Sequence, residues 1–272
     1  MIIQIRQPAQ PLAEFVQAVV FHEGFTAPHD VDRFLPDGGV EIVIDLTDEP
    51  KPIYDNDTLQ VVQTCTDAWV SGMRTGYITI PSGRDSSMMV ISFKPGAAFH
   101  FFHVPLDTLT DRVVDADHVF GTGITSLRNE IRDTTPVDAK FEAVYRWLLS
   151  RLEVPRNGYE LVRMAAGRIQ NTPTMDSIDA LAHETGITHK HLISVFRKYL
   201  GITPKQFQRV MRFQQVVQEI DSAETIDWIS IAHDCGFYDQ SHFIREFKHF
   251  SGFNPSSYLE ARSDVLNYVP VA

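Results

Sequence analysis

Apolar and polar positions divide the chain into a strand-rich part and a helical part. Up to about residue 120, short runs of β-branched and aromatic residues alternate with turn-forming residues, which is typical of strands. We expect strands at 40–46, 69–72, 77–80 and 88–93, and an early helix at 11–20. From about Thr125, apolar residues recur at helical spacing.

Residues that start and stop helices divide the segment 159–262 into seven predicted helices. A linker is expected at 151–158, which contains Pro155, Asn157 and Gly158. The predicted N-caps are Asp176, Thr188, Thr203, Thr225, Asp239 and Asn254, and the predicted glycine stops are Gly186, Gly201, Gly236 and Gly252. Thr203 and Gln206 have the spacing of a capping box, with Pro204 at the first helical position.

These patterns predict an α+β protein with two domains. Residues 1–157 are expected to form a β-rich barrel or sandwich with terminal helices. Residues 158–262 are expected to form an all-α domain, and residues 263–272 a C-terminal tail. The interiors of barrels and sandwiches commonly hold small ligands, so the first domain is a candidate sensor.

The helical part contains an internal repeat. The segment 182–187, AHETGI, aligns with 232–237, AHDCGF, and one inserted residue later Gly201 aligns with Gly252. A short helix, a glycine break and a second helix with a polar start form a helix-turn-helix, and two in tandem indicate DNA binding. The helix predicted at 204–220 spans about 25 Å at about 1.5 Å per residue. It could place two reading helices in successive major-groove segments, about 34 Å apart.

The candidate DNA-contacting residues lie on the polar faces of the two reading helices. They are His189, Lys190, Ile193, Ser194 and Arg197 in the first unit, and Asp239, Gln240, Ser241, Ile244, Arg245 and Lys248 in the second. Arg245 is the best candidate for a base contact, because arginine pairs bidentately with guanine. Gln240 could read adenine, and Arg197 and Lys248 suit either phosphate contacts or solvated positions.

Residues 159–262 resemble AraC/XylS-type transcription regulators. The similarity is carried by GFYDQSHFIREFKHFSGFNPSSY at 236–258 and GITHKHLISVFRKYLGITP at 186–204. The resemblance implies seven helices, two helix-turn-helix units, promoter binding and RNA polymerase as a candidate partner. Many members carry a long polar or basic residue where this chain has Ser194, so the first helix is expected to read less sequence.

The N-terminal part resembles a less characterised sensor domain of such regulators. The similar segments are PDGG at 36–39 with Glu41, FKPGAA at 93–98 and VPLDTLTDR at 104–112. By analogy its barrel is cupin-like at best, with an unknown small-molecule effector. Arg33, Glu41, Trp69, Arg74 and Tyr77 are candidate pocket residues, with turn anchoring and surface pairing as the alternative for each.

The net charge of −11 is unevenly distributed. Residues 158–262 carry 11 Lys and Arg against 12 Asp and Glu, a net of −1, so the remainder carries −10. A local basic face matters more for DNA than total charge. The start of the chain does not have the pattern of a secretory signal, and no run of about 18 apolar residues predicts a membrane span. Cys65 and Cys235 are far apart and are expected to be reduced thiols in a cytoplasmic protein.

The sequence offers little chemistry for catalysis or metal binding. Nucleophile-elbow, phosphate-loop, zinc-protease and dinucleotide motifs are absent, so neither enzymatic activity nor a cofactor is expected. His100 and His103 are three residues apart, but packing or hydrogen bonding is the preferred interpretation over metal binding. Two alternatives stay open for the first domain: a cupin-like enzyme, and a module that only dimerises or binds a partner. A homodimer could form through the helix predicted at 141–152.

Overall fold

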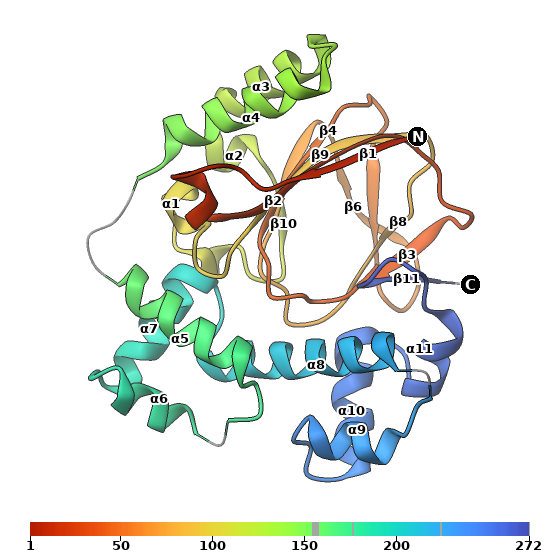
Figure 1. The fold of residues 1–272 in the computed structure, drawn as a ribbon. Coiled ribbons are helices and arrows are strands. Elements are labelled where there is room, and N and C mark those ends of the chain that lie inside the picture. The colour runs from red at the N-terminus through yellow and green to blue at the C-terminus, as the bar shows by residue number, and fades with distance from the viewer. Residues whose placement is uncertain (154–157, 176, 224, 272) are drawn as a thin grey trace.

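The protein forms a β-rich N-terminal domain that lies against a helical C-terminal domain (Figure 1). The computed structural model describes residues 1–153, 158–175, 177–223 and 225–271. The predicted α+β architecture is therefore confirmed. Residues 154–157, half of the linker predicted at 151–158, and the predicted N-cap Asp176 lie outside the described residues.

The N-terminal domain contains two antiparallel sheets. The first has six strands in the order β1 (Ile2–Arg6), β2 (Val16–Phe25), β9 (Ser86–Phe93), β4 (Glu41–Asp45), β7 (Ala68–Ser71) and β10 (Val113–Asp115). The second has five strands in the order β11 (Tyr268–Pro270), β3 (Val31–Phe34), β8 (Ile78–Pro81), β5 (Lys51–Tyr54) and β6 (Val61–Cys65). The four strands predicted from sequence correspond to β4, β7, β8 and β9.

Short helices cover one side of the six-stranded sheet (Figure 1). They are η1 (Leu12–Glu14), α1 (Phe99–Phe102), η2 (Leu106–Thr108), α2 (Asp117–Phe120), α3 (Thr122–Asp133) and α4 (Val137–Arg151). Ile42 and Ile44 of β4 are fully buried in the core that this packing creates. Successive strand residues point to opposite faces, so Glu41 and Val43 face the second sheet.

Two sequence predictions in this region are wrong. The helix expected at 11–20 is a single 3-10 turn followed by β2, because Val16, Val19 and Phe21 are buried at strand positions that pair with β9. The segment 263–272, expected to be a tail, contains β11, which pairs antiparallel with β3 of the N-terminal domain. The chain therefore returns from the helical domain to complete a sheet of the first domain.

The C-terminal domain contains the seven helices expected from the sequence. They are α5 (Tyr159–Asn171), α6 (Ile178–Glu184), α7 (His189–Leu200), α8 (Pro204–Ser222), α9 (Trp228–Asp234), α10 (Gln240–Ser251) and α11 (Pro255–Ala261). The capping box of Thr203 and Gln206 is present at the start of α8. Thr225 was expected to cap α9, but Asp227 does so, with its carboxylate accepting a hydrogen bond from the amide of Ile229. Both residue types cap helices well, and the helix simply begins at the later one.

One continuous hydrophobic core joins the two domains. Tyr159 of α5 stacks on Phe15, with ring centroids 5.7 Å apart, and meets His100 of α1 edge-on at 4.2 Å. Tyr199 of α7 packs against Phe99 at 4.7 Å. The helical domain is therefore packed onto the sheets by buried aromatic contacts.

Candidate nucleic-acid interface

The two repeats fold into matching helix pairs, α6–α7 and α9–α10. The side chain of Thr188 caps α7 by accepting from the amide of His191, and Asp239 caps α10 by accepting from the amide of His242. Both helices end at a glycine in the left-handed region, Gly201 with φ +90° and Gly252 with φ +75°. A residue with a side chain adopts this conformation at a cost, which explains glycine at both ends.

Each second helix buries one face and exposes the other. Helix α7 buries Leu192, Val195, Phe196, Tyr199 and Leu200, while α10 buries Phe243, Phe247, Phe250 and Ser251. The buried faces pack on α8, where Phe196 meets Phe207 and Phe213 stacks on Phe250. The opposite faces are therefore held outward in a fixed orientation.

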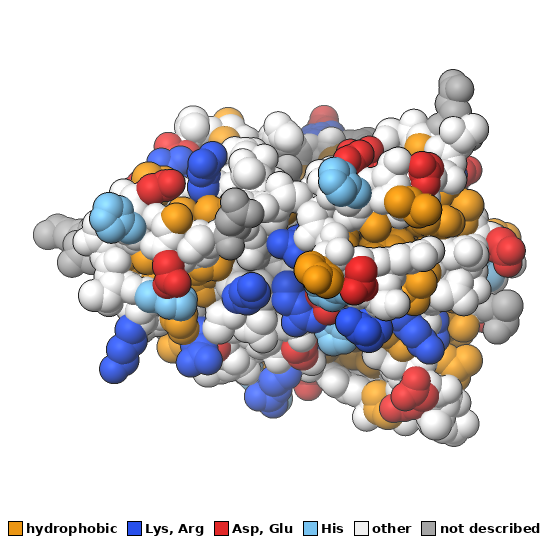
Figure 2. All heavy atoms as spheres, turned by 90° about the horizontal axis from the view of Figure 1, so that it is seen from below, with side chains coloured by type: hydrophobic (Ala, Val, Ile, Leu, Met, Phe, Trp, Pro, Cys, Tyr) orange, Lys and Arg blue, Asp and Glu red, His pale blue; other side chains and the backbone are white. Residues whose placement is uncertain are grey.

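Most of the predicted DNA-contacting residues lie on these outward faces. Those exposed are His189, Lys190, Ser194 and Arg197 on α7, and Asp239, Gln240, Ser241, Ile244, Arg245 and Lys248 at or on α10, while Ile193 is half-buried. Figure 2 shows Lys and Arg side chains distributed across the face of the molecule that carries the C-terminal helices, with histidines and a few acidic groups between them.

Two of the predicted residues already have structural partners. Asp239 is occupied as the N-cap of α10, so its carboxylate accepts a backbone hydrogen bond. The Nδ1 atom of His189 lies 3.0 Å from a carboxylate oxygen of Asp179 on α6. These two side chains hold the helix starts in place.

A bidentate ion pair connects α10 to the long central helix α8. The Nε and Nη2 atoms of Arg209 on α8 each donate to a carboxylate oxygen of Glu246, both at 2.8 Å. Burial alone would raise the pKa of Glu246, but the hydrogen bonds from Arg209 and the positive charge outweigh it and lower that pKa. Glu246 therefore stays ionised and fixes the rotation of α10 about its axis.

The N-terminal domain contacts both units at the C-terminal ends of their reading helices. In the first unit the hydroxyl of Thr110 donates to the carbonyl oxygen of Gly201 at 2.7 Å. In the second, Nε2 of His249 donates to the carbonyl oxygen of Thr75 at 3.0 Å. A Cβ added at Gly252 would lie 2.6 Å from the ring of Tyr77 and 2.7 Å from Arg33 Nη1. Both reading helices are thus held at their C-terminal ends, and their N-terminal halves remain exposed.

The two contacting loops are joined to each other within the N-terminal domain. The amide and hydroxyl of Thr75 donate to the two carboxylate oxygens of Asp111, at 2.7 and 2.6 Å. The amide of Asp111 donates to the carbonyl oxygen of Met73 at 2.9 Å. Because Thr110 and Asp111 are adjacent, this link couples the contact on the first unit to the contact on the second.

The central helix α8 is also fixed to the N-terminal domain. The side-chain amide of the buried Gln214 donates to the carbonyl of Pro36 at 2.8 Å and to the side-chain oxygen of Asn267 at 2.9 Å. A Cβ at Gly38 would lie 2.4 Å from the terminal methyl of Met211. The Pro36–Gly39 turn predicted from sequence therefore contacts the helix that joins the two reading units.

A cavity of about 710 Å³ lies between the two sheets of the N-terminal domain. Glu41, Trp69 and Ser92 line it from the first sheet, and Phe34 and Tyr268 from the second. Of the five predicted ligand-binding residues, Glu41 and Trp69 belong to this wall, while Arg33, Arg74 and Tyr77 do not.

The other three predicted ligand-binding residues occupy different places. The guanidinium of Arg33 lies over the rings of Tyr77 and Phe253, at 4.7 and 4.4 Å, on the side of the sheet that meets the helical domain. Arg74 is buried, and its Nε and Nη2 atoms have no hydrogen-bond partner among the described residues. Burial lowers the pKa of Arg74. Because side chains alternate between the two faces along β3, Arg33 points away from the cavity that its neighbour Phe34 lines.

Several contacts of this site were not predicted from the sequence. Thr75, Thr110, Asp111 and His249 are ordinary polar residues whose role depends on the packing of the two domains. Two signals were available in the sequence. One is the segment 104–112, which contains Thr110 and Asp111, and the other is the equivalence of Gly201 and Gly252 in the repeat, because glycine at both positions also permits close approach.

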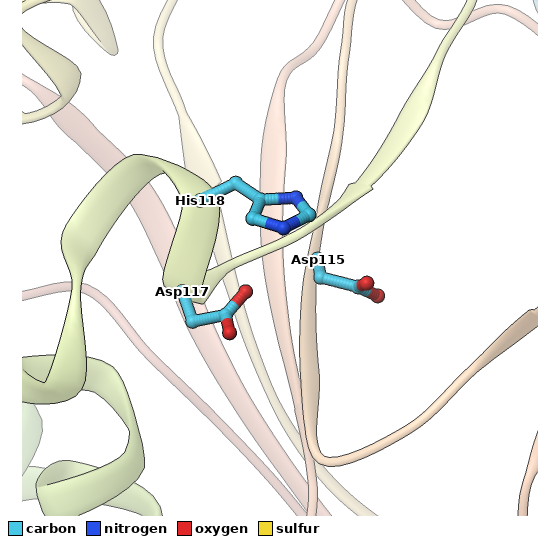
Figure 3. A group of neighbouring side chains, drawn as sticks. All are labelled: Asp115, Asp117 and His118. Atoms are coloured by element: carbon cyan, nitrogen blue, oxygen red, sulfur yellow. The ribbon is translucent and has the colours of Figure 1, made fainter.

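In the part of the chain that the structure describes, one group of three potential metal ligands lies at the surface. Asp115, Asp117 and His118 place one ligand atom each within 4.8 Å of one another, on β10 and α2, and Figure 3 shows the three side chains around one open space. His100 donates from Nδ1 to the carbonyl of Glu153 at 2.8 Å, and Nε2 of His103 contacts backbone carbonyls at 3.1 Å. Burial lowers the pKa of His100. This pair is packed and hydrogen-bonded, as the sequence interpretation preferred.

Among the described residues, no helix is both long enough and apolar enough to cross a membrane.

Comparison with known proteins finds similarity in both parts of the chain. Residues 181–261 match the model of a helix-turn-helix domain, and residues 4–115 match a domain of unknown function (DUF6597). The HTH-type transcriptional activator AarP of Providencia stuartii is 33% identical over 82 residues, which are 30% of this chain. The chain aligns with 60% of the length of that relative.

Two solved structures are similar over different shares of the chain. ToxT from Vibrio cholerae has 11% identity over 97% of this chain and 99% of its own, with a TM-score of 0.48. A probable AraC family transcriptional regulator from Rhodopseudomonas palustris has 25% identity over 37% of this chain and 95% of its own, with a TM-score of 0.34. The match to the domain model shows that residues 181–261 form a helix-turn-helix domain, and this part of the chain is similar to a transcriptional activator.

Proposed function

We propose that this protein is a sequence-specific DNA-binding transcription regulator that acts in the cytoplasm on promoter DNA. The observation that carries the proposal is the pair of reading helices, α7 and α10. Each is capped at an exposed N-terminal end and held by the N-terminal domain at the other. A helix placed in the major groove reads bases from its first turns, so the free ends are the useful ones.

The second unit carries the stronger reading surface. Arg245 and Gln240 are exposed on α10 and suit guanine and adenine respectively. On α7, Lys190 is exposed near the helix start, while Ser194 is short. Arg197 and Lys248 lie one to two turns further along and suit phosphate contacts. Backbone amides at the helix starts add phosphate contacts that need no side chain.

We propose further that residues 1–157 form the regulatory domain and residues 158–262 the DNA-binding domain. An effector in the cavity would contact β3 and β11. Arg33 of β3 lies against Phe253, and Asn267, directly before β11, bonds to Gln214. A shift of either strand would alter how α8 and α10 sit on the N-terminal domain. RNA polymerase as a partner and a homodimer through α4 belong to the same proposal.

The match to a helix-turn-helix domain and the similarity to a transcriptional activator favour this function over an enzymatic one. Two alternative interpretations are an enzyme in the first domain and a domain that only dimerises. Neither accounts for a cavity wall formed by β3 and β11, the strands that also contact the helical domain.

The experiment compares two double variants of the full chain by fluorescence anisotropy with duplex DNA. Lys190→Ala with Arg245→Ala removes one exposed cation from each reading helix. Arg84→Ala with Arg146→Ala removes two exposed cations from the N-terminal domain and serves as the control. We expect the first pair to weaken binding by about 2 kcal/mol or more, roughly thirtyfold, and the control to retain wild-type affinity. Equal losses in both would contradict a DNA interface on α7 and α10.

A further inference from the structure

The cavity between the two sheets has an acidic end. Glu41 lies on the inner face of β4, where its cross-strand neighbours are Ser92 of β9 and Ser71 of β7. The hydroxyl of Ser92 donates to the Glu41 carboxylate at 2.7 Å. No Lys, Arg or His of the described residues lies within 4.0 Å of that carboxylate in an ion pair, so Glu41 has a hydrogen bond but no cation.

The other acidic and basic side chains that are buried or half-buried at the cavity wall are paired or carry no charge. Asp32 on β3 is buried and lies 2.8 Å from Nε2 of His29. Lys51 on β5 lies 3.5 Å from the buried carboxylate of Asp45. Burial leaves His22 with a lowered pKa, so it adds no positive charge near neutral pH. Among the described lining carboxylates, only Glu41 and Asp264 have no recorded partner of opposite charge, and of these two Asp264 is exposed whereas Glu41 is half-buried between the sheets.

Further acids make the surroundings of Glu41 more negative. Burial, with the negative charge of Asp37 beside it, raises the pKa of Glu41 to about 7. Burial and the negative charges of Glu41, Asp37 and Asp32 raise the pKa of the Tyr268 hydroxyl. A positive group placed here would relieve this repulsion, and a negative one would increase it.

Aromatic rings complete this end of the cavity. Trp69 lies on β7 diagonally from Glu41, because Trp69 pairs with Val43 and Ser71 pairs with Glu41. From the opposite sheet, Phe34 and Tyr268 pair across β3 and β11, with ring centroids 5.0 Å apart. Aromatic faces attract cations, most strongly when water is excluded.

The rest of the cavity wall is predominantly apolar. Val20, Val43, Met88 and Val90 line it from the first sheet, and Ile53, Ile78 and Ile80 from the second. A volume of about 710 Å³ is within the range of pockets that hold drug-sized molecules. The occupant should therefore be largely apolar apart from one polar group.

We propose that the cavity binds an apolar small molecule carrying one protonated amine, with the amine beside the Glu41 carboxylate and the aromatic rings of Trp69, Phe34 and Tyr268. The inference rests on the proposed regulatory role of the N-terminal domain and names its ligand class. The apolar body of the ligand lies between the sheets, and its cation supplies the counter-charge that Glu41 lacks.

The test uses three probes with the same apolar body: 4-phenylbutylamine, 4-phenylbutanol and 4-phenylbutyrate. Binding to the full-length protein is measured by isothermal titration calorimetry at pH 7.5. We expect the amine to bind at least tenfold more tightly than the alcohol and the carboxylate to bind most weakly. Tightest binding by the carboxylate, or no binding by the amine, would overturn the assignment.

Matched variants of Glu41 separate the effect of its negative charge on amine binding from the effect of its side-chain shape. Glu41→Gln should reduce amine affinity to that of the alcohol and leave alcohol affinity unchanged, whereas Glu41→Asp should keep the preference for the amine. Glu142→Gln, an exposed acid on α4 outside the cavity wall, should behave as wild type. Thermal melts confirm that each variant is folded. An amine preference that survives in Glu41→Gln would overturn the proposal.

Measuring DNA affinity in the same samples distinguishes this inference from the proposed function. Loss of amine binding with DNA binding intact refutes the ligand class alone. Amine binding by a protein that does not bind DNA supports the ligand class and contradicts the proposed function.

Discussion

The two helix-turn-helix units have the same frame but differ in how firmly they are held. In each, the second helix has an N-cap that accepts the third amide and a left-handed glycine at its end. At Gly201 the N-terminal domain presents backbone as well as a side chain, since an added Cβ would lie 2.7 Å from the Thr110 hydroxyl oxygen and 2.9 Å from the carbonyl oxygen of Leu106. At Gly252 it presents the side chains of Arg33 and Tyr77.

The exposed faces that would contact DNA differ in the opposite direction: the second unit, which is held less firmly, exposes more side chains suited to reading bases. Helix α7 combines Lys190 with the short Ser194, and its His189 is engaged by Asp179. Helix α10 exposes Gln240, Ser241 and Arg245. We propose that the two units differ in role. The first unit mainly anchors the protein on DNA. The second unit, which the N-terminal domain contacts through side chains that can move, reads most of the sequence and responds to the N-terminal domain.

The largest expected effect comes from adding a methyl group at the two helix ends. Gly201→Ala and Gly252→Ala each force a non-glycine residue into the left-handed region and into contact, costing about 1–3 kcal/mol of unfolding free energy. Gly201→Ala should cost more, because the Leu106 carbonyl is fixed while Arg33 can move. Chemical denaturation measures both.

Gly167→Ala on α5 is the control for this comparison. No atom lies within 4 Å of the added Cβ, and the position is inside a helix. Alanine there should be neutral or should stabilise by up to about 1 kcal/mol. A cost at Gly252 equal to or above that at Gly201 would reverse the assignment of the firmer contact.

The next effect separates base reading from phosphate contact. Arg245→Ala should weaken binding to the preferred site by about 1–3 kcal/mol and relax one base preference. Arg197→Ala on α7 should weaken binding to all sequences alike and reduce the salt dependence by about one phosphate contact. Binding titrations on matched and single-mismatch duplexes distinguish them, and a uniform loss for Arg245→Ala would make it a phosphate contact.

A smaller effect tests the ion pair that orients α10. Glu246→Gln should cost about 1 kcal/mol at pH 7, because the pair is partly exposed to solvent. The pKa of Glu246 is lowered in the folded protein, so its contribution is present above the ordinary glutamate pKa and is lost as pH falls through the folded value. The difference in unfolding free energy between wild type and variant should shrink below about pH 4. A difference independent of pH would show that the charge contributes nothing.

The smallest expected effect concerns the link between the two contacting loops. Asp111→Asn keeps the shape and tolerates the positive φ of +56° but weakens the hydrogen bonds from Thr75. Stability should fall by about 1 kcal/mol or less. The variant should also accept sites whose two blocks are moved apart by one base pair better than wild type does. Unchanged discrimination between spacings would mean that α8 alone sets the distance.

The sequence predicted the helical domain well because its signals are local. Thr188, Asp239 and Asn254 cap the helices expected of them, and Gly201 and Gly252 end theirs. Arg245 and Gln240 are exposed on the predicted face. Capping residues and helical periodicity act within a few residues, so they can be interpreted without the fold.

The features that escaped prediction depend on contacts between distant segments. Strand β11 has three residues and exists because β3 offers an edge to pair with. Glu41 and Trp69 were expected in the pocket, but Tyr268 was not, since it reaches the wall only through that pairing. Arg33 lies over the rings of Tyr77 and Phe253 instead of facing a ligand, because β3 turns alternate side chains to opposite faces.

The most direct test of the account is selection of bound sequences from a random duplex pool by the full-length protein at near-physiological salt. We predict two short blocks about one helical turn, or about 34 Å, apart on one face of the duplex, with the stronger base preference in the block that loses information in Arg245→Ala. A single block, or enrichment that Arg245→Ala leaves unchanged, would contradict a tandem reader whose second unit dominates recognition.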